Sequence, residues 1–295
     1  MKHFYWKLKI LLESIKYAIH SWKLTTKGQL PEFEILQIAH RLEKGLTQSS
    51  PKPLWGWEKA KRLAYLLNLC EDGFAKNTGE AVLASYLNSK KERKDAKELE
   101  LLTAYESKFG RVNAKNNKLG GASSVSKEEL SFDDKEIETI RRLFVTRHSI
   151  RAFSEKEVSK NDLMKAIELT MRAPSACNRQ TTHLYVFNMD NQQSIILTGN
   201  IRAFTPDEFN DWVVSTSIYA GFLTLALHLY GIGSCIMRKQ QYGRPSFNEM
   251  IRRKCSIPEE EMIVLEIRYG YYKDYNRVAV SNRRSGDEIV TFVNE

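Results

Sequence analysis

The run from Trp212 to Leu229 places the tightest limit on the fold, because apolar or small residues occupy most faces of the helix it predicts. A helix that is apolar nearly all round is buried in a protein. No segment of the chain reaches the roughly 20 uninterrupted apolar residues of a membrane span. We therefore expect this helix to run through a core or a subunit interface.

The segments around this helix mix helices with strands. We expect a helix over 134–144, a second that Ser159 and Asp162 begin as a capping box and that Pro174 ends, and a third that Ser246 and Glu249 cap. Strands are expected over 183–187, 231–237, 262–272 and 288–293. Because no regular βαβ repeat links them, the fold class is α+β.

The first part of the chain differs, since its pattern from residue 29 to about 110 is helical throughout. Between 110 and 130 large apolar residues are nearly missing, as in a linker. We expect two parts: an all-helical extension over 1–125 and a second domain over 126–295.

Residues 1–30 hold six lysines and one glutamate, a net charge of 6 − 1 = +5. Their apolar residues recur at helical spacing on one face: Phe4, Leu8, Leu11, Leu12, Ile15, Ala18, Ile19 and Trp22. We expect this face to pack on the rest of the protein. The alternative is peripheral contact with an anionic membrane surface, with Trp6 and Trp22 at the interface.

The whole chain of 295 residues carries a net charge of +9, which implies an anionic partner. A phosphate-bearing cofactor, an acidic membrane and nucleic acid all fit, but no helix-turn-helix, RNP or zinc signature supports nucleic acid. The four cysteines form no C-x-x-C pair and have no metal-ligand spacing, so we expect no metal. Reduced thiols and the lack of a signal-peptide apolar run favour the cytoplasm.

The stretch RHSIRAF, residues 147–153, gathers donors for an anion. Arg147, His148, Ser149 and Arg151 offer two guanidinium groups, an imidazole and a hydroxyl just after a helix. A phosphate monoester has three strong acceptor oxygens and suits such donors. The alternative is a basic helix end that binds its own carbonyls.

Three further stretches fit a flat, charged ligand. APSACNRQ, residues 173–180, ends a helix in small and amide-bearing residues, although it could be only a capping loop. Gly231 and Gly233 let backbone approach a ring. The stretch 282–284, Asn-Arg-Arg, is a second candidate for anion binding, with a solvated loop as the alternative.

These four features, in this order, resemble the nitroreductase family of FMN-dependent oxidoreductases from about residue 134 to 295. The resemblance implies a central antiparallel or mixed sheet flanked by helices. It also implies a homodimer with FMN sites at the subunit interface. No side chain is expected to be catalytic, because the flavin carries the chemistry.

The resemblance also implies a role for each site residue. The phosphate would be held by Arg147, His148, Ser149, Arg283 and Arg284, and the flavin pyrimidine edge by Arg151. The partner subunit would supply Pro174, Ser175 and Ala176, with Asn178 supporting that loop. The flavin ring would contact Asn200, Gly233, Ser234, Cys235 and Ile236.

NADH or NADPH would donate hydride, and a small nitroaromatic- or quinone-like molecule would accept electrons. The stretch HRLEKGL, residues 40–46, resembles the extension of family members associated with polysaccharide biosynthesis. The alternative function is a flavin-binding but non-catalytic scaffold in such a pathway.

Overall fold

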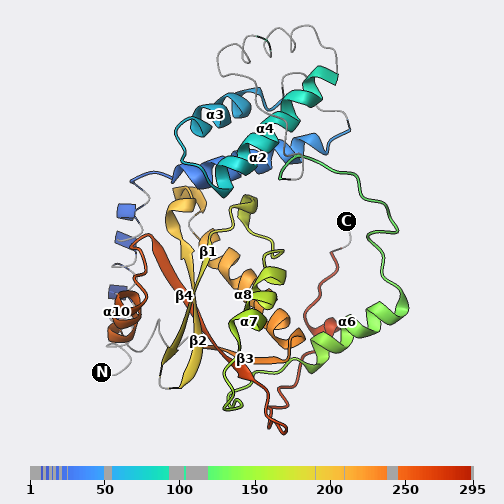
Figure 1. The fold of residues 1–295 in the computed structure, drawn as a ribbon, viewed down its shortest axis with the longest axis vertical. Coiled ribbons are helices and arrows are strands. Elements are labelled where there is room, and N and C mark those ends of the chain that lie inside the picture. Colours follow the sequence, from blue (N-terminus) through green and yellow to red (C-terminus); the bar gives the residue numbers. More distant parts are fainter. Residues whose placement is uncertain are drawn as a thin grey trace.

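A computed structural model describes residues 26–49, 55–92, 119–189, 191–208, 210–237 and 245–293, except the side chains of 90–92 and 245–247. It also describes residues 22–24 and the single positions Leu8, Leu11, Leu12, Ile15, Ala18, Ile19 and Thr103. Phe4, Trp6 and most of the expected linker lie outside this set. Figure 1 shows a helical unit above a larger unit built on a sheet.

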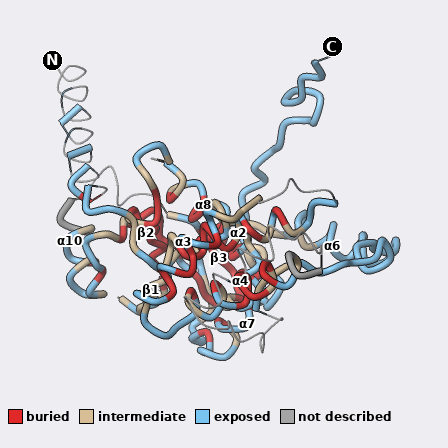
Figure 2. Tube along the Cα trace, turned by 90° about the horizontal axis from the view of Figure 1, so that it is seen from above, coloured by how far each residue is buried: buried red, intermediate tan, exposed pale blue. Residues whose placement is uncertain are grey.

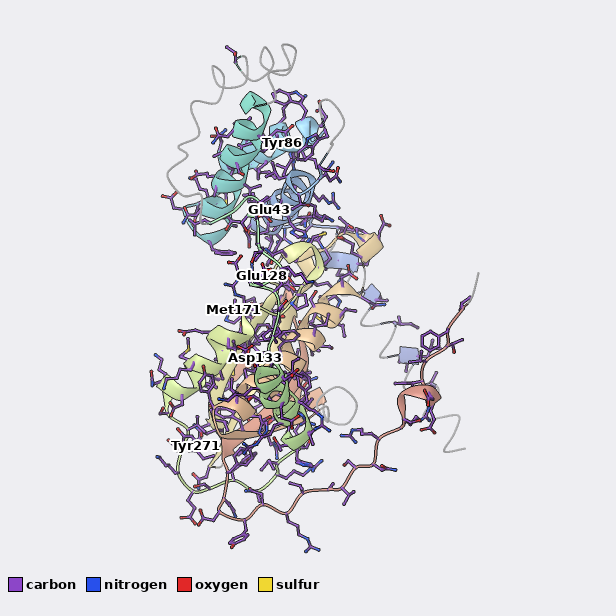
Figure 3. All side chains as sticks on the ribbon, turned by 90° about the vertical axis from the view of Figure 1, so that its right-hand side faces the viewer. Glu43, Tyr86, Glu128, Asp133, Met171 and Tyr271 are labelled. Atoms are coloured by element: carbon purple, nitrogen blue, oxygen red, sulfur yellow. The ribbon has the colours of Figure 1, made fainter. Side chains whose placement is uncertain are left out.

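The upper unit contains α2 (Pro31–Leu46), α3 (Trp57–Leu67) and α4 (Phe74–Glu92). Pro31 lies in the first turn of α2, as its fixed φ allows. Leu42, Leu63 and Tyr86 are fully buried in a core of their own, and the Tyr86 hydroxyl donates to the Trp55 carbonyl at 2.7 Å. In Figure 3 Glu43 and Tyr86 lie in this unit, far from Met171 and Tyr271.

The lower unit contains one antiparallel sheet in the order β1-β2-β4-β3. Its strands are β1 (Thr182–Met189), β2 (Gln192–Asn200), β3 (Ile232–Met237) and β4 (Glu261–Tyr271). The predicted α+β class is confirmed. The sequence analysis missed β2, because side chains on both of its faces are buried and the strand shows no alternation: Ile195 and Leu197 face one core, and Ile196 the other.

Helices cover both faces of this sheet. One face packs against α7 (Lys160–Thr170) and α8 (Asp211–Leu229), and the other packs against α10 (Pro245–Lys254) through Ile251. Among the described helices, α8 alone is long and apolar enough to cross a membrane, yet half of it is buried in the protein. The expected core helix is therefore observed, although Val214, Ile218 and Phe222 on its outer side are exposed.

The helix α6 (Asp134–Thr146) begins at a capping box between Asp133 and Glu136 and buries none of its residues. Its apolar residues Ile137, Ile140 and Phe144 face solvent in the single chain. Two exposed apolar faces, on α6 and on the outer side of α8, thus occur in one molecule.

The predicted strand over 288–293 is wrong. The described residues from 281 to 293 contain only a single helical turn, η4 (Gly286–Glu288), and are exposed throughout. Val280, Phe292 and Val293 have the composition of a strand but lie against neither the sheet nor a core within this chain. Figure 2 shows this tail leaving the body of the molecule.

The expectation that the apolar face of residues 1–30 packs on the protein is also wrong for the described part. Leu8, Leu11, Leu12, Ile15, Ile19 and Trp22 are exposed. Leu24 is different, because it is buried in the main core of the lower unit. The division at residues 125/126 stays a prediction, since Leu24 and Phe33 of the first part pack into the second.

Candidate functional site

The RHSIRAF stretch forms an added edge on the sheet. After α6 ends at Thr146, Arg147 is extended, and Ser149 pairs with Ser234 of β3 in a parallel bridge. The Ile150 N–H donates to the Ser234 carbonyl at 2.9 Å. A Cβ on Gly233 would lie 3.0 Å from the Ile150 Cβ, so Gly233 makes room for this stretch. Gly233 was expected to let a ligand ring approach the backbone. In this chain the Ile150 side chain makes that close approach.

A cleft of about 580 Å³ opens beside this edge. It brings together six of the predicted residues: Arg147, Ser149, Arg151, Ser234, Cys235 and Ile236. The other wall belongs to α6 and α8: Phe144, Ser217, Ile218, Gly221, Phe222, Thr224 and Leu225. None of the described lining residues is acidic. The cleft thus combines two guanidinium groups and hydroxyls with an apolar wall.

We call residues 147–153 the Arg147 turn. A residue that the sequence analysis missed, His228, supports this turn. Its Nε2 lies 2.8 Å from the Thr146 Oγ1 and its Nδ1 lies 2.6 Å from the Tyr272 hydroxyl. Burial lowers the pKa of His228, and the charges of Arg147 and His148 lower it further. The imidazole is therefore neutral at pH 7 and acts as a hydrogen-bonding support. A single histidine inside an apolar helix was the available signal.

The APSACNRQ stretch, residues 173–180, forms a tight turn rather than an open pocket. We call it the Arg179 turn. Ser175 Oγ accepts from the Gln180 N–H at 3.0 Å, and Ser215 Oγ accepts from the Ala176 N–H at 3.1 Å. Cys177, Asn178 and Gln180 have φ of 49°, 51° and 51°. Such left-handed residues persist only where their surroundings hold them.

A cavity of only about 20 Å³ lies at this turn, lined by Pro174 and Ser175 among others. It shares no lining residue with the Arg147 cleft. One chain therefore presents the two predicted halves of the site at separate places. Asn178 is exposed and accepts from the Gln180 side-chain amide at 3.4 Å, within the same turn.

The fully buried Arg179 fastens this turn to the rest of the molecule. Its Nη2 donates to both carboxylate oxygens of Glu208 at 2.8 Å, and its guanidinium carbon lies 4.8 Å from the centre of the Phe204 ring. With the Gln37 amide turned to satisfy both arginines, its oxygen accepts from Arg41 at 2.9 Å and from Arg179. Because Gln37 belongs to α2, the helical unit helps to hold the turn.

The Glu208 carboxylate stays charged opposite Arg179. Burial raises the pKa of Glu208, but the hydrogen bonds from Arg179 and from Thr205 outweigh it, so that its pKa lies below the ordinary value. Within the described protein the Arg179 Nε and Nη1 have no hydrogen-bond partner. Arg179 is therefore held by the Glu208 carboxylate, the Gln37 oxygen and the Phe204 ring, and its role is to position the turn.

Besides Ala176, Asn178 and Gly233, four predicted site residues lie outside both cavities in this chain. Asn200 ends β2, and its side chain accepts from the Arg202 N–H at 2.9 Å. His148 is half-buried beside the cleft without lining it. Arg283 and Arg284 are exposed on the C-terminal tail, where Arg283 donates to the Ser281 carbonyl.

A comparison with protein families finds a match in this part of the chain. The model of the nitroreductase family matches residues 145–212, a segment that includes both the Arg147 turn and the Arg179 turn. The predicted resemblance is thereby confirmed. Residues 145–212 of this chain are therefore similar to the nitroreductase family.

Individual relatives are more distant. An Archaeoglobus fulgidus protein, named as an NADH dehydrogenase/NAD(P)H nitroreductase, is 26% identical over 155 residues, which are 47% of this chain and 88% of the relative. An FMN-dependent nitroreductase of Mycobacterium smegmatis, solved with NADPH, is 16% identical over 54% of this chain and 99% of its own, with a TM-score of 0.45. An FMN-bound nitroreductase of Desulfitobacterium hafniense is 16% identical over 53% and 98%, with a TM-score of 0.43.

Proposed function

We propose that this protein is an FMN-dependent oxidoreductase that transfers hydride from NADH or NADPH to a small acceptor. The observation that carries the proposal is the Arg147 cleft, where cationic and hydroxyl groups meet an apolar wall. The Archaeoglobus fulgidus relative, whose name includes NAD(P)H nitroreductase activity, supports the same donor.

The residues of the cleft fit FMN. A phosphate needs charged donors and a hydroxyl, and Arg147 and Ser149 supply them. A flavin ring needs open space beside apolar side chains. A Cβ on Gly221 would meet nothing within 4 Å, and Ile218 and Ile236 lie on the same cleft. We propose that Arg147 and Ser149 hold the phosphate and that Ser234, Cys235 and Ile236 line the ring.

Bound FMN would supply the redox chemistry by accepting hydride and passing electrons to the acceptor. The protein's own contribution is to bind, orient and stabilise charge. Arg151 lines the cleft with an exposed guanidinium, which suits it to stabilise negative charge on the pyrimidine edge. The apolar side chains of Ile218 and Phe222 would exclude water from one wall.

We propose that two copies of the chain complete the site. The exposed apolar faces of α6 and α8 border the cleft, and burial of Ile218 and Phe222 would stabilise a dimer. The second copy would bring its Pro174, Ser175 and Ala176 to the flavin, held by its Asn178 and Arg179. In this dimer, Arg283 and Arg284 would contact the FMN phosphate only if the extended C-terminal tail packs against the protein.

The test of this binding site is a pair of substitutions. Arg147→Ala combined with Arg284→Ala should retain the fold by circular dichroism and lose FMN, measured by visible absorbance and by cofactor release on denaturation. Arg141→Ala is the matched control, because Arg141 is exposed on α6 and its one ion pair among the described residues is with Glu138 at 3.4 Å. Unchanged FMN content in the double variant would refute the phosphate assignment.

Turnover distinguishes the enzyme from the scaffold alternative. The purified yellow protein should oxidise NADH or NADPH in the presence of a quinone or nitrofurazone. A protein that retains FMN but turns over neither nicotinamide with any acceptor would favour a flavin-binding scaffold, and the HRLEKGL resemblance would then point to a polysaccharide pathway.

A further inference from the structure

An apolar stripe near the N-terminus, which the proposed oxidoreductase function does not use, faces solvent. Its members are helical and between 43% and 67% exposed: Leu8, Leu11, Leu12, Ile15, Ile19 and Trp22. We call these six residues the N-terminal stripe. Exposed large apolar side chains grouped at helical spacing are typical of an interaction site.

The chain just after the stripe is fixed to the body of the protein. Leu24 is buried in the main core, the Gln29 side chain donates to the Ala203 carbonyl at 2.8 Å, and Arg202 Nε donates to the Gly28 carbonyl at 3.2 Å. The stripe therefore ends at a firm attachment, but the body does not cover its apolar side chains.

Positive charge accompanies the stripe. Residues 1–30 hold six lysines against one glutamate. Lys9, Lys16 and Lys23 recur every seven residues, three positions before Leu12, Ile19 and Thr26. This spacing is typical of cationic residues along one edge of an apolar helical face.

A second basic group lies on the same side of the sheet. Arg253 and Lys254, in the last turn of α10, are both exposed. Figure 1 and Figure 2 both show the described N-terminal segments on the α10 side of the molecule. The described N-terminal segments and the basic end of α10 thus lie on the same side of the molecule.

We propose that the N-terminal stripe binds an anionic membrane surface. Leucine and isoleucine side chains suit the boundary between headgroups and acyl chains, while lysines suit acidic headgroups. Trp22, the most exposed member, is of the residue type enriched at membrane interfaces. The charge complementarity selects an anionic lipid surface as the occupant, so that the enzyme would be a peripheral membrane protein.

The test uses the full chain and vesicles of defined composition. Phosphatidylcholine vesicles are compared with vesicles of phosphatidylcholine and phosphatidylglycerol, and bound protein is measured by sedimentation at low and high salt. We expect binding to the anionic vesicles to be at least about tenfold stronger and to weaken with salt. Equal absence from both vesicle types would overturn the proposal.

The stripe is tested by Leu11→Glu combined with Ile15→Glu, which should reduce binding to anionic vesicles by about tenfold or more. The matched control is Leu69→Glu combined with Phe74→Glu, since both residues are exposed apolar residues of the helical unit. Binding that survives the stripe variant would overturn the proposal, as would a lower molecular mass of that variant in solution, because a second copy would then be the occupant.

FMN content, measured in the same samples, separates this proposal from the proposed function. A stripe variant that leaves vesicles but retains its flavin is the expected result, and it also shows that the variant is folded. A colourless wild-type protein that still binds anionic vesicles would contradict the flavin assignment while supporting the stripe.

Discussion

The two turns of the candidate site differ in charge, space and rigidity. The Arg147 turn borders a cleft of about 580 Å³ and displays its guanidinium groups toward that space. The Arg179 turn borders about 20 Å³ and directs its arginine inward, to Glu208 and Phe204. Both turns contain arginine and small residues, so sequence composition alone does not separate them.

This difference indicates that the two turns have different roles in the candidate site. The first turn directs arginine side chains to a space with room for a ligand, whereas the second directs its arginine into the protein and offers a rigid surface of small residues. A rigid surface contributes to binding only when something is placed against it. We therefore infer that the second turn completes the cleft of another copy.

The largest effect on stability is expected from removing the arginine that holds the Arg179 turn. Arg179→Met should lower the free energy of unfolding by about 2–3 kcal/mol, because the partly exposed Glu208 carboxylate loses two charged hydrogen bonds. Denaturant unfolding measures this change. Arg172→Met, at an exposed position of the same segment, is the control and should be nearly neutral. A loss below about 1 kcal/mol for Arg179→Met would mean that the turn is held by other contacts.

The next effect concerns the apolar face of α8 that would join the two turns in the proposed dimer. Ile218→Arg places a charge on the outer side of α8 and should halve the mass measured by light scattering. FMN should be lost with the dimer. Leu169→Arg, on an exposed position of α7, should change neither quantity. A monomeric variant that still binds FMN tightly would show that one chain suffices.

A smaller effect is expected from replacing His228, whose hydrogen bonds support the Arg147 turn. His228→Gln removes the hydrogen bonds to Thr146 and Tyr272 and should cost about 1 kcal/mol of stability. The wild type should also lose stability as the pH falls below 6.5, because burial keeps the folded pKa of His228 under that value and the unfolded chain binds the proton first. Thermal unfolding between pH 7.5 and 5 should show a weaker pH dependence in the variant.

The smallest effect is expected from removing the hydrogen bond between β4 and α7, the helix that precedes the Arg179 turn. The Tyr271 hydroxyl donates to Asp162 at 2.6 Å and, with Lys165 and Ser159, lowers the pKa of that carboxyl to about 2. The stability this adds is present above the ordinary value of 3.8 and is lost as the pH falls toward 2. Tyr271→Phe should raise the Asp162 pKa in an NMR titration, and an unchanged pKa would contradict the assignment.

Much of the fold could be predicted, because caps and periodicity are local. Ser159 caps α7 as expected, and the apolar run after Trp212 is the core helix α8. Strand β2 could not be found this way, since a strand buried on both faces lacks alternation. The segment 288–293 has the β-branched residues of a strand, but it pairs with none of the strands in the described part of the chain.

The site was predictable where one short stretch contains the donors. Arg147, Ser149 and Arg151 follow one another and meet in one cleft. His228 and Tyr272 were missed because their meeting with Thr146 depends on the tertiary fold. The buried role of Arg179 was missed because its partners, Glu208 and Gln37, lie far from it in sequence.

The most direct measurement is the number of FMN molecules bound per chain, determined together with the mass of the particle in solution. The account predicts one FMN for each chain of 34.1 kDa and a particle of twice that mass. A particle with the mass of one chain, or a chain that remains colourless when FMN is added at micromolar concentration, would contradict it.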